Sequence, residues 1–125
     1  MQYMLLIYDA EQQWAALGEE ERGKIFQEYG AYTRDLRESG AFVAGDALQP
    51  TSTSTTVEYR DGKTLTTDGP FAETKEQLGG YYLVDVESID EAIEWAAKIP
   101  SARHFGKVEV RPILQVGAPS EAGAR

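Results

Sequence analysis

The chain has 125 residues, 42% of them apolar and 26% charged, which is the composition of one globular domain. It contains no cysteine and one histidine, which excludes disulfides and thiol chemistry and argues against a zinc site. Its 12 basic and 21 acidic residues give a net charge of −9, which disfavours nucleic-acid binding. No apolar run approaches the roughly 20 residues of a membrane span, and no signal-peptide pattern is present, so we expect a cytoplasmic protein.

The first third of the chain predicts a strand followed by a long helix. Residues 3–8 are a short apolar run rich in aromatic and branched side chains, typical of a central strand. Residues 9–18 predict a loop or short turn. Three carboxylates at 19–21 favour a helix N-terminus, and Gly40 is a suitable C-terminal cap, so we expect a helix over 19–39. One helical stripe is formed by Ile25, Tyr29, Tyr32 and Leu36.

The middle of the chain predicts a short strand and a hairpin. A second strand begins at residues 41–45. Residues 53–59 are β-branched and lead into Asp61-Gly62, the strongest two-residue hairpin signal. Residues 63–67 should pair back on them.

The last third predicts a strand, a helix and an edge strand. Residues 80–86 alternate enough for a strand. Ser88 and Glu91 form a capping box for a helix that we expect Pro100 to stop. The final strand carries Pro112, which suggests a sheet edge. We expect residues 1–116 to form the domain.

The small, polar residues 117–125 predict a flexible C-terminal tail.

The order of these elements matches an α+β fold, the ferredoxin-like split βαβ plan with an added β-hairpin. Both helices of that plan lie on one face of the sheet, which leaves apolar side chains on the other face. We expect a second copy to cover that face, as a two-fold homodimer. Loops of the same chain are the alternative cover.

The segment Asp68-Gly69-Pro70-Phe71-Ala72-Glu73-Thr74-Lys75-Glu76 joins turn residues to a cluster of charges. With Gly79-Gly80-Tyr81-Tyr82 and Val108-Glu109-Val110-Arg111-Pro112, it closely resembles the YCII-related, or DGPF-domain, family over about residues 3–114.

The resemblance implies a dimeric α+β barrel built from two ferredoxin-like subunits. Relatives on that fold include small-molecule isomerases, monooxygenases and lyases, and some family members are encoded near sigma factors. The compact members carry a His-Asp pair near the end of the first helix region. Because His104 is the one histidine of this chain, that pair does not carry over.

Two residues are candidates for acid/base catalysis. Asp68 is either a general base or a carboxylate that closes the turn through backbone N–H groups. His104 would titrate near neutral pH, although a histidine in a loop before a strand is more often simply exposed.

A second group of residues is a candidate for substrate binding. Glu73, Lys75 and Glu76 form either a substrate clamp or a solvated salt-bridge cluster. Arg111 either pairs with Glu109 or binds a carboxylate in bidentate fashion. Tyr82 is either a core aromatic or a pocket hydroxyl.

Two functions follow as hypotheses. The first is a cofactorless lyase or isomerase that moves protons on a small organic acid. One histidine and no cysteine argue against a metal site, and phosphate-cradling and dinucleotide-binding motifs are absent. The second is a non-catalytic module that binds a metabolite or contacts a sigma factor. Convergence of the candidate residues in one enclosed pocket would favour the enzyme.

Overall fold

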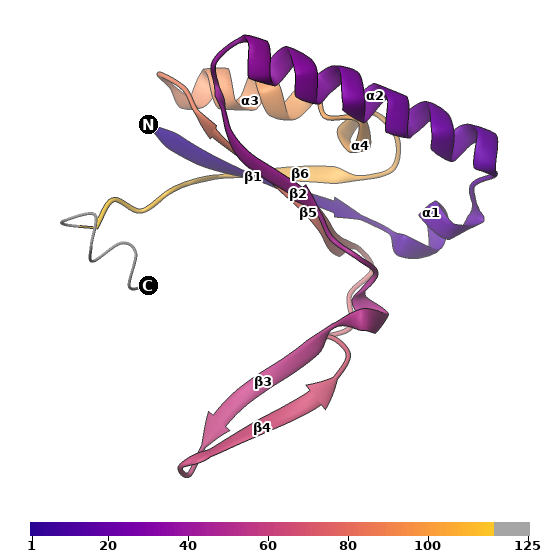
Figure 1. Ribbon diagram of the computed structural model, residues 1–125, viewed down its shortest axis with the longest axis vertical. Helices are drawn as coiled ribbons and strands as arrows, with labels where there is room; N and C mark the ends of the chain where they lie inside the picture. The colour runs from indigo at the N-terminus through magenta and orange to yellow at the C-terminus, as the bar shows by residue number, and fades with distance from the viewer. Residues whose placement is uncertain (117–125) are drawn as a thin grey trace.

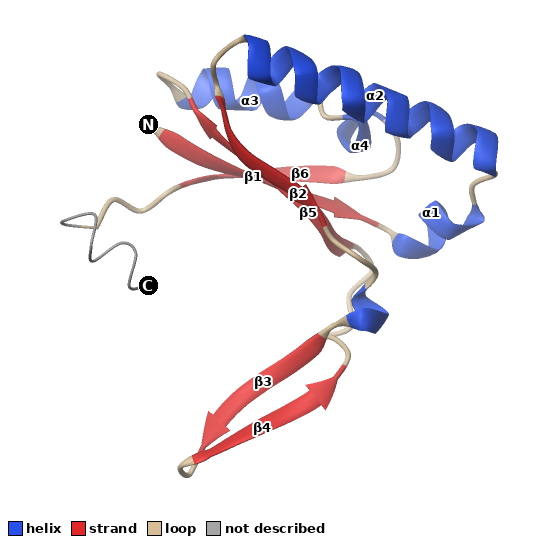
Figure 2. Ribbon diagram, viewed as in Figure 1, coloured by secondary structure: helices blue, strands red, loops and turns tan. Residues whose placement is uncertain are grey.

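The computed structural model describes residues 1–116, and the predicted tail at 117–125 lies outside the described residues. Within 1–116 the protein is a mixed α+β structure with one four-stranded antiparallel sheet and a separate two-stranded ribbon (Figures 1 and 2). The strands are β1 Gln2–Asp9, β2 Phe42–Ala47, β3 Thr55–Arg60, β4 Lys63–Asp68, β5 Gln77–Asp85 and β6 Lys107–Pro112. The helices are α1 Glu11–Ala16, α2 Glu19–Glu38, the 3₁₀ turn η1 Thr51–Thr53, α3 Ile89–Ala97 and α4 Pro100–Arg103.

The four-stranded sheet has the order β2-β5-β1-β6, so β1 is central and β6 lies at an edge. The proline in the last strand therefore occupies the edge position that its missing N–H requires. Helices α2, α3 and α4 lie together on one face of this sheet (Figure 2).

The core lies between those helices and the sheet. Alternate residues of β1 and β5 face it, among them Leu5, Ile7 and Val84. The predicted stripe of α2 packs on them: Leu36 is fully buried and the Tyr32 ring meets Tyr82 edge-on. The apolar stripe of the helix, which repeats every 3.6 residues, and the inward side chains of the strands, which repeat every two, thus pack against each other in one core layer.

Most predicted boundaries agree with the structure. Helix α2 ends at Glu38 and is followed by Gly40 with φ +84°, the left-handed cap that glycine favours. In the ribbon turn, Asp61 and Gly62 both have positive φ, as a primed two-residue hairpin turn requires. The backbone N–H of Glu91 donates to Ser88 Oγ at 3.3 Å, so the capping residue of α3 is confirmed.

Two predictions for connecting segments were wrong. Residues 9–18 contain helix α1 rather than a loop, held by Trp14, whose ring packs edge-on against Phe26. Pro100 does not itself stop α3, which already ends at Ala97. It occupies the first turn of α4, where a missing N–H leaves no hydrogen bond unmade.

No helix formed by residues 1–116 covers the second face of the sheet (Figure 1). Met4, Leu6 and Tyr8 alternate with the buried residues of β1 and so lie on this open face. Leu83 of β5 follows the same alternation. The face is therefore apolar along its two central strands.

The ribbon of β3 and β4 projects from the sheet on the side away from the helices (Figure 1). Its side chains are almost all exposed, including Val57 at 61% and Tyr59 at 76%. Val57 pairs across the ribbon with Thr66 and Tyr59 with Thr64, so both apolar side chains share one ribbon face.

Candidate functional site

A cleft of about 480 Å³ lies between α2 and the β2–β5 side of the sheet, and α1 closes one end of it. This size suits a small organic molecule. Its walls are largely aromatic and aliphatic, with rings from Trp14, Phe26, Tyr29, Phe42 and Tyr82. Among the described residues, this cleft is therefore the place that best encloses a small apolar ligand.

Three polar side chains in this cleft form one hydrogen-bonded chain. Ser101 donates from Oγ to Asp9 Oδ2 at 3.0 Å, and its oxygen lies 2.5 Å from the Tyr29 hydroxyl. Because the single proton of Ser101 goes to Asp9, Tyr29 is the donor to Ser101. Asp9 ends β1, Tyr29 lies in α2 and Ser101 in α4, so the chain spans three elements.

Asp9 is held where its charge is poorly compensated. Its second oxygen, Oδ1, is buried and has no hydrogen-bond partner among the described residues. Burial raises the pKa of Asp9 above its ordinary 3.8, the Ser101 hydrogen bond lowers it, and the charge of Glu76 raises it further. A carboxyl group that readily takes up a proton is what acid/base catalysis uses.

Two glycines, Gly79 and Gly106, lie against the Asp9 carboxyl group and make room for it because they have no side chains. A Cβ on Gly106 would lie 2.1 Å from Asp9 Oδ1 and 2.6 Å from the carbonyl oxygen of Tyr8. Gly79 is the extra residue of a β-bulge, because Ile7 pairs with Gly80 and Tyr8 with Leu78. Bulges of this kind often lie beside functional sites, where they redirect a strand.

Tyr29 takes part in the same series of hydrogen bonds through Ser101. Burial raises the pKa of Tyr29 to about 12, while the Ser101 hydrogen bond lowers it and the charge of Asp9 raises it. The phenol of Tyr29 is therefore neutral near pH 7 and can both donate and accept a hydrogen bond.

A second hydroxyl pair lies further along the cleft. The Tyr82 hydroxyl and Thr33 Oγ1 are 2.6 Å apart. The Tyr82 ring covers Gly45, where a Cβ would lie 2.7 Å from the ring. Burial raises the pKa of Tyr82, whereas the Thr33 hydrogen bond and the positive charge of Arg37 lower it. Arg37 also lines the cleft.

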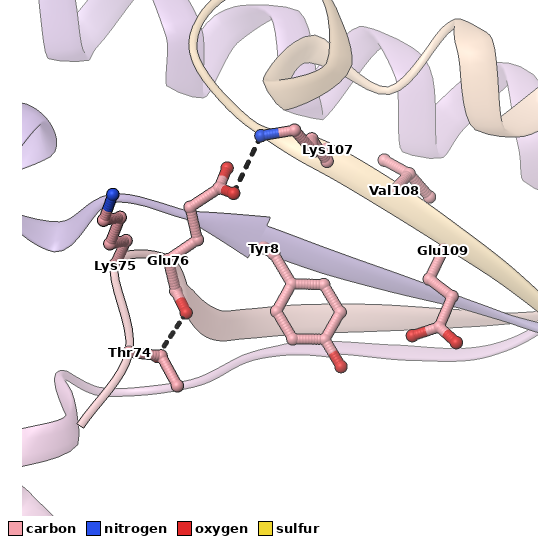
Figure 3. Close-up of a pocket in the computed structure, with 7 residues that line it drawn as sticks. All are labelled: Tyr8, Thr74, Lys75, Glu76, Lys107, Val108 and Glu109. Carbon is pink, nitrogen blue, oxygen red and sulfur yellow. Dashed lines mark hydrogen bonds and ion pairs between the residues drawn. The ribbon is translucent and has the colours of Figure 1, made fainter. Parts of the chain in front are cut away.

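A more open groove of about 520 Å³ lies beside β1 and β6 (Figure 3). Lys107 Nζ contacts Glu76 Oε1 at 2.8 Å, and Thr74 Oγ1 donates to the Glu76 carbonyl oxygen. Lys75 and Tyr8 also line the groove (Figure 3). Its ion pair is largely exposed on the lysine side, which makes the groove a solvated surface feature rather than an enclosed site.

The residues predicted from the sequence occupy different places. Tyr82 lines the cleft, whereas Lys75 and Glu76 line the open groove. Asp68 and Glu73 are exposed, and neither lines the cleft or the groove.

The remaining two candidates each contact a carboxylate at the surface. His104 Nε2 lies 2.9 Å from Glu28 Oε1, and Arg111 Nη2 lies 2.5 Å from Glu109 Oε2. Pairing with Glu109 raises the pKa of Arg111. Of the two alternatives for Arg111, pairing with Glu109 or binding a carboxylate, this contact corresponds to the first. Within one chain, the predicted residues therefore do not all converge in one pocket.

Sequence reasoning did not single out Asp9, Tyr29 and Ser101. The sequence places Tyr29 in an apolar helical stripe, and it places Asp9 directly after the first predicted strand, at the start of the loop predicted for residues 9–18. The available signals were an acidic residue ending a central strand and small residues opposite it, Gly79 and Gly106. These signals indicate a site only once the fold is known, because α4 brings Ser101 to the end of β1.

Within residues 1–116, no group of three or more histidine, cysteine or acidic residues could hold a metal ion. None of the helices in this part of the chain is both long and apolar enough to cross a membrane.

Together, the antiparallel sheet with helices on one face and the enclosed cleft define a small α+β protein with one candidate ligand site. A sequence model of the YCII-related domain matches residues 1–116, and the chain belongs to this family. It is also similar to "Uncharacterized protein R00369" of Rhizobium meliloti (strain 1021). That similarity is 39% identity over 114 residues, covering 90% of this chain and 92% of the relative.

Proposed function

We propose that this protein is a cofactorless lyase or isomerase that moves a proton on a small organic acid bound in the cleft. Asp9 is the group that gains and returns the proton. The observation that carries the proposal is the Tyr29–Ser101–Asp9 chain, which links an under-compensated carboxyl group to the wall of a largely apolar cleft.

The hydrogen bonds that link Tyr29, Ser101 and Asp9 provide a complete path for a proton. When a C–H bond beside a substrate carbonyl breaks, its electron pair stays on the substrate as an enolate. The Tyr29 oxygen accepts the proton while its own proton passes to Ser101 and that of Ser101 to Asp9 Oδ2. Reversal of these steps returns a proton to the substrate, so no oxidant or reductant is consumed.

The proposal is tested by solvent exchange. The protein is incubated in D₂O with pyruvate, acetoacetate or phenylpyruvate, and deuterium incorporation at the carbon beside the carbonyl is followed by NMR. We expect exchange above the buffer rate with at least one acid, and a loss of about 100-fold or more in Asp9→Asn and Tyr29→Phe.

The residues predicted from the sequence supply the controls. Asp68→Asn and His104→Gln alter exposed side chains outside the cleft, so exchange should persist in both. Loss in these variants but not in Asp9→Asn would overturn the assignment to the cleft. Binding of an acid without exchange would instead support a non-catalytic metabolite-binding module.

We also propose that the working form is a homodimer of ferredoxin-like subunits, with the open sheet faces of two copies forming a dimeric α+β barrel. The order β2-β5-β1-β6, with the helices on one face, supports the ferredoxin-like plan. The apolar side chains of the open face support a second copy as its cover.

The ribbon supports the same assembly. An isolated two-stranded hairpin is at best marginally stable in water, yet this one extends from the body with Val57 and Tyr59 exposed. It projects on the side of the sheet where the second copy would lie (Figure 1). A partner surface would give its apolar face a place to pack.

A further inference from the structure

We propose that Arg37 binds the carboxylate of an aromatic ligand in the cleft, so that the organic acid of the proposed function carries a ring. The inference rests on the cleft being the ligand site of that function. It adds a specificity residue and a chemical class of ligand.

Arg37 is the cationic side chain among the described residues that line the cleft. Its guanidinium carbon lies 4.1 Å from the centre of the Phe42 ring. Within residues 1–116, no ion pair or side-chain hydrogen bond joins the guanidinium to another group, unlike those of Arg60 and Arg111.

Stacking leaves the binding groups of Arg37 available. Contact with an aromatic ring uses one face of the planar guanidinium, while its N–H donors lie in the plane and along its edge. These donors match the two oxygens of a carboxylate in bidentate fashion. The ring of Phe42 also limits the conformations of Arg37, so less side-chain freedom is lost when an anion binds.

The walls of the cleft favour a ring beside that carboxylate. Tyr82 meets the Phe42 ring at 6.4 Å and 73°, and Trp14 meets Phe26 at 5.5 Å and 83°. These edge-on pairs present ring faces and edges to the cleft, which suits a further aromatic ring.

Other carboxylates near the cleft do not oppose an anion strongly. Glu11 is engaged by Thr51, whose backbone N–H and hydroxyl donate to its two oxygens at 2.7 and 2.9 Å. Asp46 accepts the Tyr81 hydroxyl at 2.9 Å. Asp9 accepts from Ser101 at 3.0 Å, so one of its oxygens is also engaged.

Three small probes separate the parts of this proposal. Phenylacetate carries both ring and carboxylate, 2-phenylethanol replaces the carboxylate by an alcohol, and acetate lacks the ring. Binding is followed by NMR on the ¹⁵N-labelled full chain. The indole N–H of Trp14 reports from the cleft, and that of Trp95, which packs against Tyr32 outside it, is the internal control.

We expect phenylacetate to shift the Trp14 signal and to bind at least tenfold more tightly than either 2-phenylethanol or acetate. In Arg37→Gln the affinity for phenylacetate should fall at least tenfold, while that for 2-phenylethanol stays the same. Arg34→Gln, an exposed change one turn earlier on α2 and outside the cleft lining, should bind all three probes as the unaltered protein does.

Equal binding of acid and alcohol, equal loss in the Arg34 and Arg37 variants, or no shift of Trp14 at millimolar phenylacetate would each overturn the proposal. A merely structural role for Arg37 at the end of α2 would weaken all probes alike. Asp9→Asn should retain phenylacetate binding, so that failure of the exchange chemistry and failure of ligand recognition give different results.

Discussion

Gly106 leaves room for the Asp9 carboxyl group, because it has no side chain. The carboxyl group of Asp9 and the backbone of β1 occupy the volume that any larger side chain at position 106 would need. The sequence shows only a glycine before a strand. The contact that makes it necessary is formed by residues almost a hundred positions apart.

We expect Gly106→Ala to destabilise the fold by about 2–3 kcal/mol, because the new methyl group overlaps the Tyr8 carbonyl oxygen as well as Asp9. Chemical denaturation measures this change. Gly23→Ala is the matched control: it lies within α2 with nothing near its Cβ position, so it should stabilise by about 0.5–1 kcal/mol. Equal effects of the two changes would contradict the close contact at Gly106.

Asp9 should also make stability depend on pH. Its pKa is raised in the folded protein, so the folded state holds this proton more tightly than the unfolded chain does. The resulting stability is fully present below the unfolded value of 3.8 and is lost as the pH rises through the folded value.

We therefore expect Asp9→Asn, which cannot ionise, to gain thermal stability relative to the unaltered protein between pH 4 and pH 8. Melting temperatures of both proteins across this range give the measurement. A difference that is constant with pH would show that the Asp9 pKa is the same in the folded and unfolded states.

Among the elements, α3 is the one whose start is specified most locally. Ser88 accepts the Glu91 N–H, while Asp90 and Glu91 place negative charge at the positive end of the helix. Such signals act within one turn and so are readable without the rest of the fold.

Ser88→Ala should cost about 1 kcal/mol, which lowers the melting temperature of a domain of this size by about 4 °C. Differential scanning calorimetry measures the shift. Ser52→Ala, an exposed change in η1, is the control and should leave the melting temperature within about 1 °C. A shift no larger than that of the control would mean that the cap contributes little.

Helix α1 shows the opposite case. Its six residues have no side-chain cap and no buried residue, so local sequence does not specify it. It is held by tertiary contacts: the Glu11 backbone N–H donates to Gln77 Oε1 at 2.9 Å, and the Trp14 ring packs on Phe26 and Phe105. These partners come from three other segments, and this explains why a loop was predicted.

At the scale of the whole molecule, the open sheet face and the ribbon are the surfaces that residues 1–116 of a single chain leave uncovered. A stable interface removes about 800 Å² of surface from each partner. Four strands spaced about 4.8 Å apart and about 20 Å long present roughly 400 Å² of flat face, and the ribbon adds roughly 200 Å². Together these flat areas give roughly 600 Å², and the uneven surface of the side chains raises the area that a second copy would cover toward that of a stable interface.

We expect light scattering at micromolar concentration to give twice the mass of the 13.8 kDa chain. Leu6→Lys, on the open face, should shift the mass to that of one chain, because moving a charged ammonium group out of water into an apolar interface opposes association. Tyr59→Ser on the ribbon should weaken the dimer, with circular dichroism confirming that both variants fold.

Ile93→Lys on the solvent side of α3 controls for the added charge and should remain dimeric. A monomeric mass for the unaltered protein would contradict the assembly, as would dimers that persist in Leu6→Lys.

Periodicity, caps and turn residues specified the long helix, the capped α3, the ribbon turn and the edge position of β6, because each depends on neighbours within a few residues. The candidate site did not follow from the sequence in this way. The residues chosen for their chemistry, such as Asp68 and His104, lie in exposed positions, and Tyr82 alone among the predicted site residues lines the cleft.

By itself, then, the sequence determined the family, the α+β class and most element boundaries, since these are written in local patterns and in one long motif. Only the tertiary structure decided where a proton could be held. Asp9, Tyr29 and Ser101 are ordinary residues until β1, α2 and α4 meet, and the pKa of a carboxyl group depends on burial and hydrogen-bond partners that no linear pattern contains.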